Sequence, residues 1–181
     1  MTNLADNTWT PPTTGGTIDI TTGGTVTEVY LDALVNNLRV LGGSTGTYSG
    51  KYTLGTPVAI PTSTWTPVNH DTDAWDPEGW HATAGAANAN VIVPYAGQYQ
   101  VKAHHYFTGN VIGYRSLRVM LNAVNSHYAN GTAVGAAPTT IDVEDWLDVQ
   151  SVPGTIQIQA WQDSGGTLNV AASGYLVVRR L

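Results

Sequence analysis

The strongest constraint in this sequence is a two-residue alternation of apolar and polar side chains along its last two-thirds. Successive side chains of a β-strand point to opposite faces, so such alternation predicts strands with one buried side. The clearest run places these residues on one face: Tyr99, Val101, Ala103, His105 and Phe107. Residues 117–122 and 155–160 alternate in the same way, with Ile156, Ile158 and Ala160 expected to face inward. The final run, 174–178, is apolar enough for a central strand.

Turn-forming residues separate these runs and suggest many short strands. The turn sequences are Pro94-Tyr95-Ala96-Gly97, Asn130-Gly131, Val152-Pro153-Gly154 and Ser164-Gly165-Gly166. Proline and glycine supply the backbone conformations that tight turns require. Residues 45–181 are therefore predicted to form an all-β domain, a β-sandwich for which we favour the jelly-roll topology.

Residues 1–44 read as a separate N-terminal arm and helix. Thr25-Val26-Thr27-Glu28 matches a helix-capping box, and Gly42-Gly43 is a natural helix end. Between them, four leucines recur at the spacing of one helix face: Leu31, Leu34, Leu38 and Leu41. Two heptads are too short for a stable isolated coiled coil, so the stripe must pack on something. We expect these leucines and Trp9 to serve oligomerisation or docking; packing of the helix on its own domain stays open.

Composition excludes several classes of protein. Charged residues are only 11% of the chain, the net charge is -6, and there are 7 Lys and Arg residues, which argues against nucleic-acid binding. There is no cysteine, hence no disulfide framework. No apolar run approaches the roughly 18 residues of a membrane helix. The first residues lack signal-peptide features, so we expect synthesis in a cytoplasm and no membrane insertion.

No motif of a known catalytic class occurs, and the chain is predicted not to be an enzyme. The sequence lacks a Gly-x-Ser-x-Gly elbow, a P-loop, a His-Glu-x-x-His motif and a dinucleotide fingerprint. His104 and His105 would point to opposite faces of one strand and cannot share a metal. The acidic residues of 142–148 alternate with apolar ones and are interpreted as the solvated side of a strand or a subunit contact.

The acidic segment 70–81 holds the candidate binding residues. Asp71, Asp73 and Asp76 are candidate calcium ligands, because calcium prefers several oxygen ligands. Trp75, Trp80 and His81 are candidate contacts to a receptor, since a tryptophan face suits the apolar side of a sugar ring. Two alternatives stay open: a solvated loop of Asx turns, and tryptophans that pack on the end of the sandwich. No other cofactor is expected.

One segment resembles a known family. Val91-Ile92-Val93-Pro94-Tyr95-Ala96-Gly97-Gln98-Tyr99-Gln100-Val101 is similar to the apolar–Pro–x–x–Gly–x–Tyr–x–Val motif of C1q/tumour-necrosis-factor-like jelly rolls. Residues 115–122 resemble that family's strand leading into an Asn-containing turn, and 173–176 its last strand. Pro153-Gly154-Thr155 stands where the family usually has Gly-Asp, so any role of that acidic residue is absent. The resemblance implies homotrimers built around a threefold axis.

The N-terminal part resembles small bacteriophage virion proteins. Trp9-Thr10, then Gly24-Thr25-Val26-Thr27, then Leu31 to Leu38 follow the order seen in the first segment of phage tail proteins. Together the resemblances imply a non-enzymatic protein of the virion surface, made in the host cytoplasm. Its partners would be copies of itself, other virion proteins, and a host surface glycan or protein.

Two placements on the virion compete. We favour a tail-associated fibre or adhesin that attaches to the host. The alternative is a capsid decoration or head-fibre protein that stabilises the capsid lattice. A cellular C1q-like protein is a third hypothesis, disfavoured because it needs a signal peptide.

Overall fold

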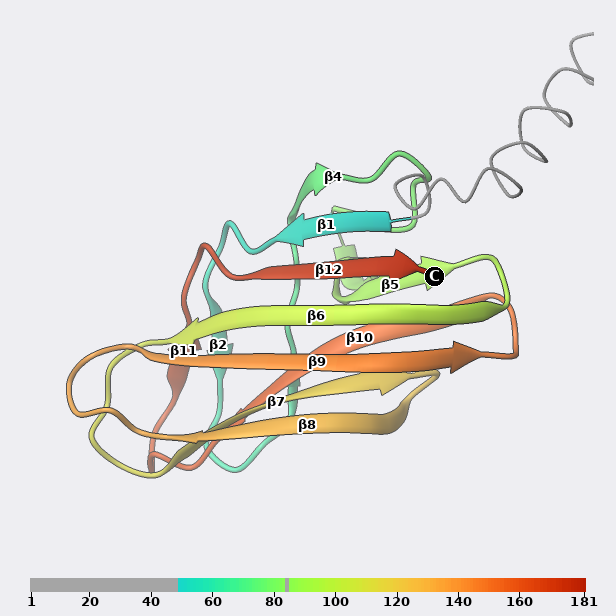
Figure 1. The fold of residues 1–181 in the computed structure, drawn as a ribbon. Coiled ribbons are helices and arrows are strands. Elements are labelled where there is room, and N and C mark those ends of the chain that lie inside the picture. Colours follow the sequence, from blue (N-terminus) through green and yellow to red (C-terminus); the bar gives the residue numbers. More distant parts are fainter. Residues whose placement is uncertain (1–48, 84) are drawn as a thin grey trace, which may run out of the picture. The chain divides into compact units, whose positions relative to one another are not determined.

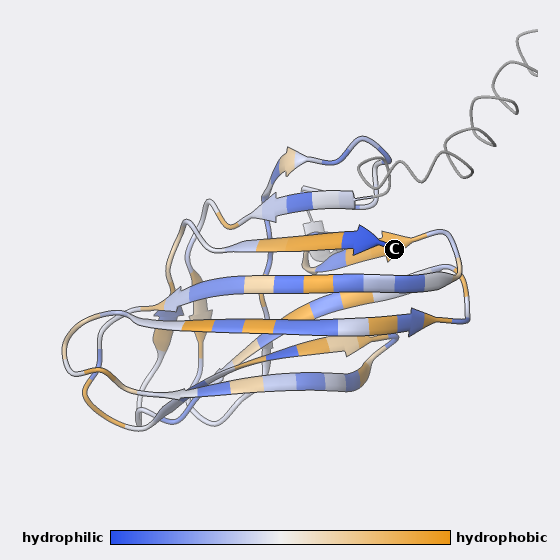
Figure 2. Cartoon of the chain, viewed as in Figure 1, coloured by the Kyte–Doolittle hydropathy of each residue, from blue (hydrophilic) through white to orange (hydrophobic). Residues whose placement is uncertain are grey.

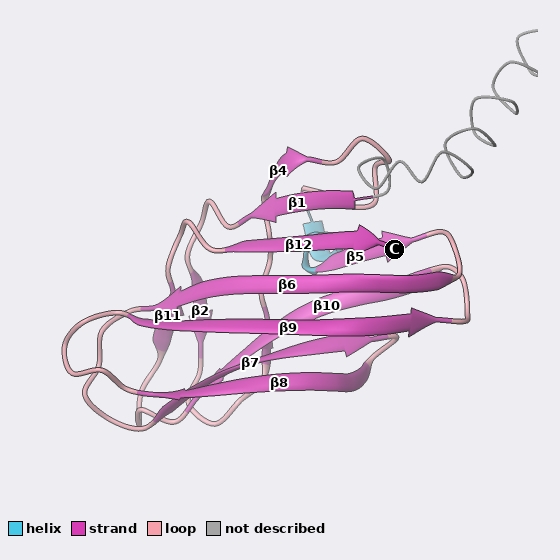
Figure 3. Cartoon of the chain, viewed as in Figure 1, coloured by secondary structure: helices cyan, strands magenta, loops and turns pink. Residues whose placement is uncertain are grey.

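The computed structural model describes residues 49–83 and 85–181, and within them the chain is almost entirely β-structure (Figure 3). One short 3-10 helix, η1 (Gly85–Ala89), interrupts the strands. The strands are β1 (Ser49–Thr53), β2 (Val58–Ile60), β3 (Thr66–Pro67), β4 (Thr72–Trp75), β5 (Asn90–Val93), β6 (Gly97–Phe107), β7 (Tyr114–Leu121), β8 (Val124–Thr132), β9 (Thr139–Val149), β10 (Gly154–Gln162), β11 (Leu168–Val170) and β12 (Tyr175–Arg180). The predicted arm, helix and Trp9 lie outside the described residues.

The strands form two antiparallel sheets (Figure 1). Sheet A runs in the order β4, β1, β12, β6, β9, and β11 and β2 continue from the end of β6. Sheet B runs β8, β7, β10, and the free edge of β10 pairs with β5 and then β3. The first described strand therefore pairs with the last, and β5 pairs with β10 across some 60 residues. This nesting of distant strands is the jelly-roll sandwich predicted from the sequence.

The core lies between the sheets and follows the predicted alternation (Figure 2). All five residues expected to face inward on β6 are buried, and Gln98, Gln100, Lys102, His104 and Tyr106 lie on the other face. Along β10, Ile156, Ile158 and Ala160 are buried as predicted. Burying such side chains supplies the main driving force of folding, about 25 cal/mol per Å² of apolar surface.

On β9, the prediction of which face one side chain points to is wrong. Asp145 was grouped with the solvated acidic residues, but it pairs with the buried Val101 and follows the inward parity of Val143 and Leu147. Residues directly opposite in an antiparallel pair share a face, so Asp145 points to the interior side. Asp142, Glu144 and Asp148 are exposed, as expected.

The turn between β5 and β6 explains the Pro-x-x-Gly-x-Tyr pattern that this chain shares with C1q/TNF-like jelly rolls. Pro94 follows β5, and Gly97 adopts φ +137, a conformation that L side chains rarely adopt. Tyr99 is fully buried, and its hydroxyl donates to the carbonyl of Tyr95 at 2.8 Å. Asn122 (φ +51) and Ala123 (φ +64) form the tight turn between β7 and β8. Helices long and apolar enough to span a membrane are absent from the described residues.

Candidate functional site

The acidic segment after β4 is held together by its own carboxylates. Asp76 accepts hydrogen bonds from the backbone N–H groups of Trp80 (3.1 Å) and His81 (3.0 Å). The His81 ring lies 2.6 Å from Asp73 through Nδ1 and 2.9 Å from the carbonyl of Asn88 through Nε2. These contacts close the loop on itself, in the manner of Asx turns.

The carboxylates do not gather into a cation site. Asp71 lies apart from that network and accepts the N–H of Gly55 at 2.5 Å. Burial raises the pKa of Asp71, but hydrogen bonds from Thr56 and Gly55 outweigh it and hold that pKa below its usual range. Residues 49–83 and 85–181 contain no group of three or more His, Asp or Glu side chains that could hold a metal. The binding of calcium by Asp71, Asp73 and Asp76 stays a prediction, which these contacts do not support.

Two of the three predicted receptor contacts are covered. Trp80 is buried and packs edge-on against Tyr99, with ring centroids 5.9 Å apart. The side chain of His81 has no exposed surface and lies against Tyr52. Both residues therefore support the end of the sandwich, the alternative interpretation given above for the tryptophans. Trp75, 45% exposed, keeps a surface position on β4, and its predicted contact stays a prediction.

A pair of buried histidines lies beneath sheet A. His70 and His105 approach through their Nε2 atoms at 3.3 Å, and both are fully buried. Burial lowers the pKa of His105 to about 3, with a smaller contribution from His104. Burial and the neighbouring His105 also lower the pKa of His70. Both rings are therefore neutral at ordinary pH, and one donates its Nε2 proton to the other.

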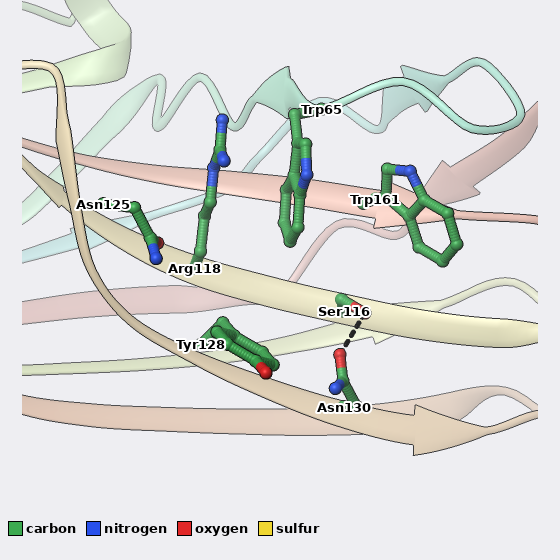
Figure 4. A pocket seen from close by; sticks show the side chains of 7 residues that line it. All are labelled: Trp65, Ser116, Arg118, Asn125, Tyr128, Asn130 and Trp161. Carbon is green, nitrogen blue, oxygen red and sulfur yellow. Dashed lines mark hydrogen bonds between the residues drawn. The ribbon is translucent and has the colours of Figure 1, made fainter.

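The outer face of sheet B is hollowed by a shallow groove of about 440 Å³ (Figure 4). Its lining comes from the segment before β3 and from β7, β8 and β10. The lining residues are Trp65, Ser116, Arg118, Asn125, Tyr128, Asn130 and Trp161. Three of the seven are aromatic, one is cationic and none is acidic.

Arg118 is fixed in the wall of this groove. Its guanidinium lies over the Trp65 ring, 4.2 Å from the centroid, and donates from Nε and Nη2 to Gln159 Oε1 at 2.9 and 2.6 Å. Trp161 lies on the same side of the groove, 6.3 Å from Trp65 between centroids. Gln159 in turn donates to Gln157. The guanidinium, indole and amide groups thus hold one another in place before any ligand arrives.

On the outer face of sheet A, partly exposed side chains contact one another across strands. His104 stacks on Tyr175 at 5.2 Å between centroids, and Tyr106 meets the same imidazole edge-on at 4.7 Å. Asp142 lies 2.6 Å from His104 Nδ1, and Lys51 lies over the Tyr175 ring. These cross-strand contacts produce a broad, aromatic and charged surface.

Comparison with known structures identifies proteins that share this fold. Murine APRIL at pH 5.0 matches with a TM-score of 0.57 and 11% identity, over 74% of this chain and 98% of that one. The globular domain of zebrafish complement 1qA protein matches at 0.53 and 11%, over 74% and 95%. The PRD1 vertex protein P5 matches at 0.51 and 14%, over 74% and 72%. No protein-family model and no curated protein matches the sequence.

The described domain is a C1q/TNF-like jelly roll. This bears out the fold implied by the resemblance around Val91–Val101. At 11–14% identity the likeness shows the fold alone, so it carries no ligand or partner over to this chain.

Sequence reasoning missed the groove of this jelly roll. The alternation of β10 places Trp161 on the opposite face from Ala160, so its outward position could have been predicted. Trp65 carried no comparable signal, because the position of β3 depends on its pairing with β10 at Thr66. The groove exists only because β10 pairs with β3 on one edge and with β7 on the other.

Proposed function

We propose that this protein is a non-enzymatic component of a phage virion surface, that it forms homotrimers, and that it serves host attachment at the tail. A phage vertex protein, PRD1 P5, is among the structures that share the fold. The N-terminal resemblance to phage tail proteins supports the same placement. Docking through Trp9 and the leucine stripe is part of the proposal.

The observation that carries the trimer is the distribution of charge on the outer face of sheet A. Acidic residues line the edge strand β9, at Asp142, Glu144 and Asp148. Basic residues lie toward the other side, Lys51 on β1 and Arg179 on β12. A cyclic trimer uses a heterologous contact, in which one patch of a protomer meets a different patch of the next. An acidic edge strand and basic residues on the interior strands β1 and β12 suit such a ring, because opposite charges orient the approach.

Aromatic and aliphatic surface on the same face would supply the association energy. Trp146 is 62% exposed beside the acidic residues, and Tyr106, Tyr175 and Val177 extend the patch across β6 and β12. Exposed tryptophan and tyrosine are typical of residues that dominate binding energy in protein interfaces. Burying Trp146 and the half-buried Tyr106, Tyr175 and Val177 between protomers would remove their remaining apolar surface from water.

We propose that the protein is not an enzyme because its histidines and loop carboxylates are already engaged in structural contacts. The buried histidines contact each other, and the loop carboxylates bind backbone N–H groups. Of these groups, Asp71 lines a hollow of about 350 Å³, and its carboxylate already accepts the N–H of Gly55. Recognition and assembly therefore account for the geometry better than chemistry does.

Sedimentation equilibrium of the full chain tests the trimer. The expected mass is three times the 19.1 kDa of one chain. A single 19.1 kDa species at micromolar concentration would contradict the proposal.

Capsid decoration is the alternative function, and copy number separates it from tail attachment. Decoration of a capsid lattice requires hundreds of copies per virion, whereas attachment at a tail requires a few trimers. Quantitative mass spectrometry of purified virions gives this number directly. A count in the hundreds would replace the tail proposal with decoration and leave the trimer intact.

A further inference from the structure

We propose that the groove on the outer face of sheet B binds a pyranose saccharide. This deepens the attachment function by naming the ligand class. It rests on that function only for its biological purpose, since the groove belongs to a single protomer. The residues that carry it are Trp65, Arg118, Tyr128 and Trp161 (Figure 4).

The aromatic residues provide the apolar part of a sugar site. A pyranose ring has a face of C–H groups that packs on an aromatic plane, while its hydroxyls point outward. Tyr128 is 55% exposed on β8, and Trp161 is half-buried on β10, so both keep ring surface available. In Figure 4 Trp65 stands between Arg118 and Trp161, and Tyr128 lies across the groove from that row. Rigid aromatic rings offer this contact with little loss of conformational freedom.

Planar polar groups stand beside these rings. Ser116 donates to the amide oxygen of Asn130, which leaves that amide's N–H groups for another acceptor. Asn125 lines the groove from the β7–β8 end. Arg118 uses two of its five N–H donors on Gln159, so three remain for hydroxyl or carboxylate oxygens. Amides and a guanidinium flanking an aromatic surface match the hydroxyl rim of a sugar better than they match an apolar peptide.

Charge and size narrow the ligand. The groove has one cation and no carboxylate, yet the whole chain carries a net charge of -6, which disfavours polyanions such as nucleic acid. Its volume of about 440 Å³ lies at the lower end of the roughly 300–1,000 Å³ usual for ligand sites. One or two sugar residues fit this description, either neutral or with a single carboxylate near Arg118.

The site stays open in the proposed assembly. Sheet A uses its outer face for association, and the groove is on the outer face of the other sheet. A shallow site of this kind binds weakly, with a Kd on the order of 1 mM. Three such sites on one trimer gain strength through avidity on a surface covered with glycan.

Saturation-transfer NMR of the full chain tests the proposal with three named probes: lactose, maltose and 3′-sialyllactose, with glycerol as a control polyol. We expect transfer to the ring protons of at least one saccharide and none to glycerol. A response confined to 3′-sialyllactose, lost in Arg118→Gln, assigns an acidic sugar; an equal response to lactose or maltose assigns a neutral one. No transfer to any of the three saccharides would overturn the inference.

Matched variants locate the site. Tyr128→Ala and Trp161→Ala should each weaken binding about tenfold, the range of an interface hot spot. Tyr95→Ala, at the exposed turn between β5 and β6, is the control and should leave saccharide binding unchanged. Because Tyr128 is exposed, its truncation keeps the test valid even if Trp161→Ala fails to fold. Binding that survives Tyr128→Ala, or that is lost in Tyr95→Ala, would contradict the site.

The same samples separate this inference from the proposed function. A trimer that binds no saccharide overturns the groove and leaves the assembly standing. A monomer that binds saccharide through Tyr128 overturns the trimer and leaves the groove standing.

Discussion

The outer faces of sheets A and B arise from the same two-residue alternation, yet they present different surfaces. On sheet A the exposed side chains of β6, β9 and β12 contact one another across strands, as in the stack of His104 on Tyr175. On sheet B the guanidinium of Arg118 packs on Trp65 and leaves a hollow beside it. The first surface suits a large protein partner, and the second suits a small ligand.

The difference shows that burial alone does not decide what an outer face does. Both sheets bury their inner faces against one core, so neither outer face is needed to stabilise the sandwich. What separates them is whether the exposed side chains fill the space between strands or leave it open. Substitutions on each face can therefore be read almost independently, provided that the sites lie far apart and share no partners.

The largest effect is expected from a charge placed on the association face. Val177 lies on the outer side of β12, opposite Lys51 on β1 and Lys102 on β6. Val177→Asp should convert trimers to monomers, because its carboxylate would neutralise the basic patch beside Lys51 and would meet the acidic strand β9 of the next protomer, where like charges repel. Sedimentation equilibrium measures this as a threefold fall in mass. Val124→Asp, an exposed position on β8, is the control and should remain trimeric; equal behaviour of the two variants would break the comparison.

Acid sensitivity is expected to come from beneath sheet A. The pKa of His105 is lowered to about 3 and that of His70 is also lowered, while in the unfolded chain both return to about 6.5. The unfolded state therefore binds more protons between these values, and the free energy of unfolding falls as pH drops from 6.5 toward 3. His105 alone should account for a loss on the order of 3 kcal/mol by pH 4, and His70 should add to it in the same direction.

Urea unfolding at a series of pH values measures this loss. The paired substitution His70→Leu with His105→Leu removes both polar partners together, so it should flatten the acid limb without leaving a buried group unsatisfied. An acid limb of unchanged slope in that variant would place the sensitivity elsewhere.

A smaller effect is expected from close packing at the same histidine. A Cβ on Gly174 would lie 2.1 Å from His105 Nδ1 and 3.0 Å from the carbonyl of His104. Gly174→Ala should therefore cost about 1–3 kcal/mol of stability. Gly166→Ala, where a Cβ meets nothing within 4 Å, is the matched control. Equal unfolding midpoints for the two variants would show that His105 can shift to accommodate the new Cβ without loss of stability.

Substitution of Trp75 tests a third surface, at the β4 edge of sheet A. It is exposed on β4, at the far edge of sheet A from β9. Trp75→Ala should change the free energy of unfolding by no more than about 0.5 kcal/mol, as at most surface sites. Attachment of the same purified variant to host cells tests the predicted receptor contact of Trp75. Loss of attachment with saccharide binding intact would move the receptor contact to β4.

The smallest effect is expected from metal removal. The carboxylates of Asp73 and Asp76 already contact His81 and backbone N–H groups, and Asp71 contacts Gly55. EDTA should therefore leave the thermal midpoint unchanged. A fall of several degrees that calcium reverses would restore the metal site.

Side-chain parity and turn positions were predictable because they depend on neighbours in the sequence. The inward residues of β6 and β10 follow the two-residue period, and the turn at Gly97 follows from its flanking proline and glycine. Asp145 breaks the simple rule that an acidic residue lies outside. Its parity was readable from Val143 and Leu147, and composition was the weaker guide.

Contacts between distant segments were not predictable in the same way. His70 and His105 meet across 35 residues, and Trp65 reaches Arg118 across more than 50. Trp80 is buried because Asp76 fixes the path of its loop, which no periodicity indicates. The alternation in the sequence therefore determined which side chains face outward, and strand pairing determined which of them lie side by side.

Because the chain contains no cysteine, single cysteines can report directly on the two outer faces. In the isolated protomer, Lys102 on sheet A and Asn125 on sheet B are both exposed. The decisive measurement is the rate of thiol modification of Lys102→Cys and Asn125→Cys in the native full chain. Slow reaction at position 102 together with fast reaction at position 125 is the predicted result. Equal, fast reaction at both positions would contradict the assignment of sheet A to self-association.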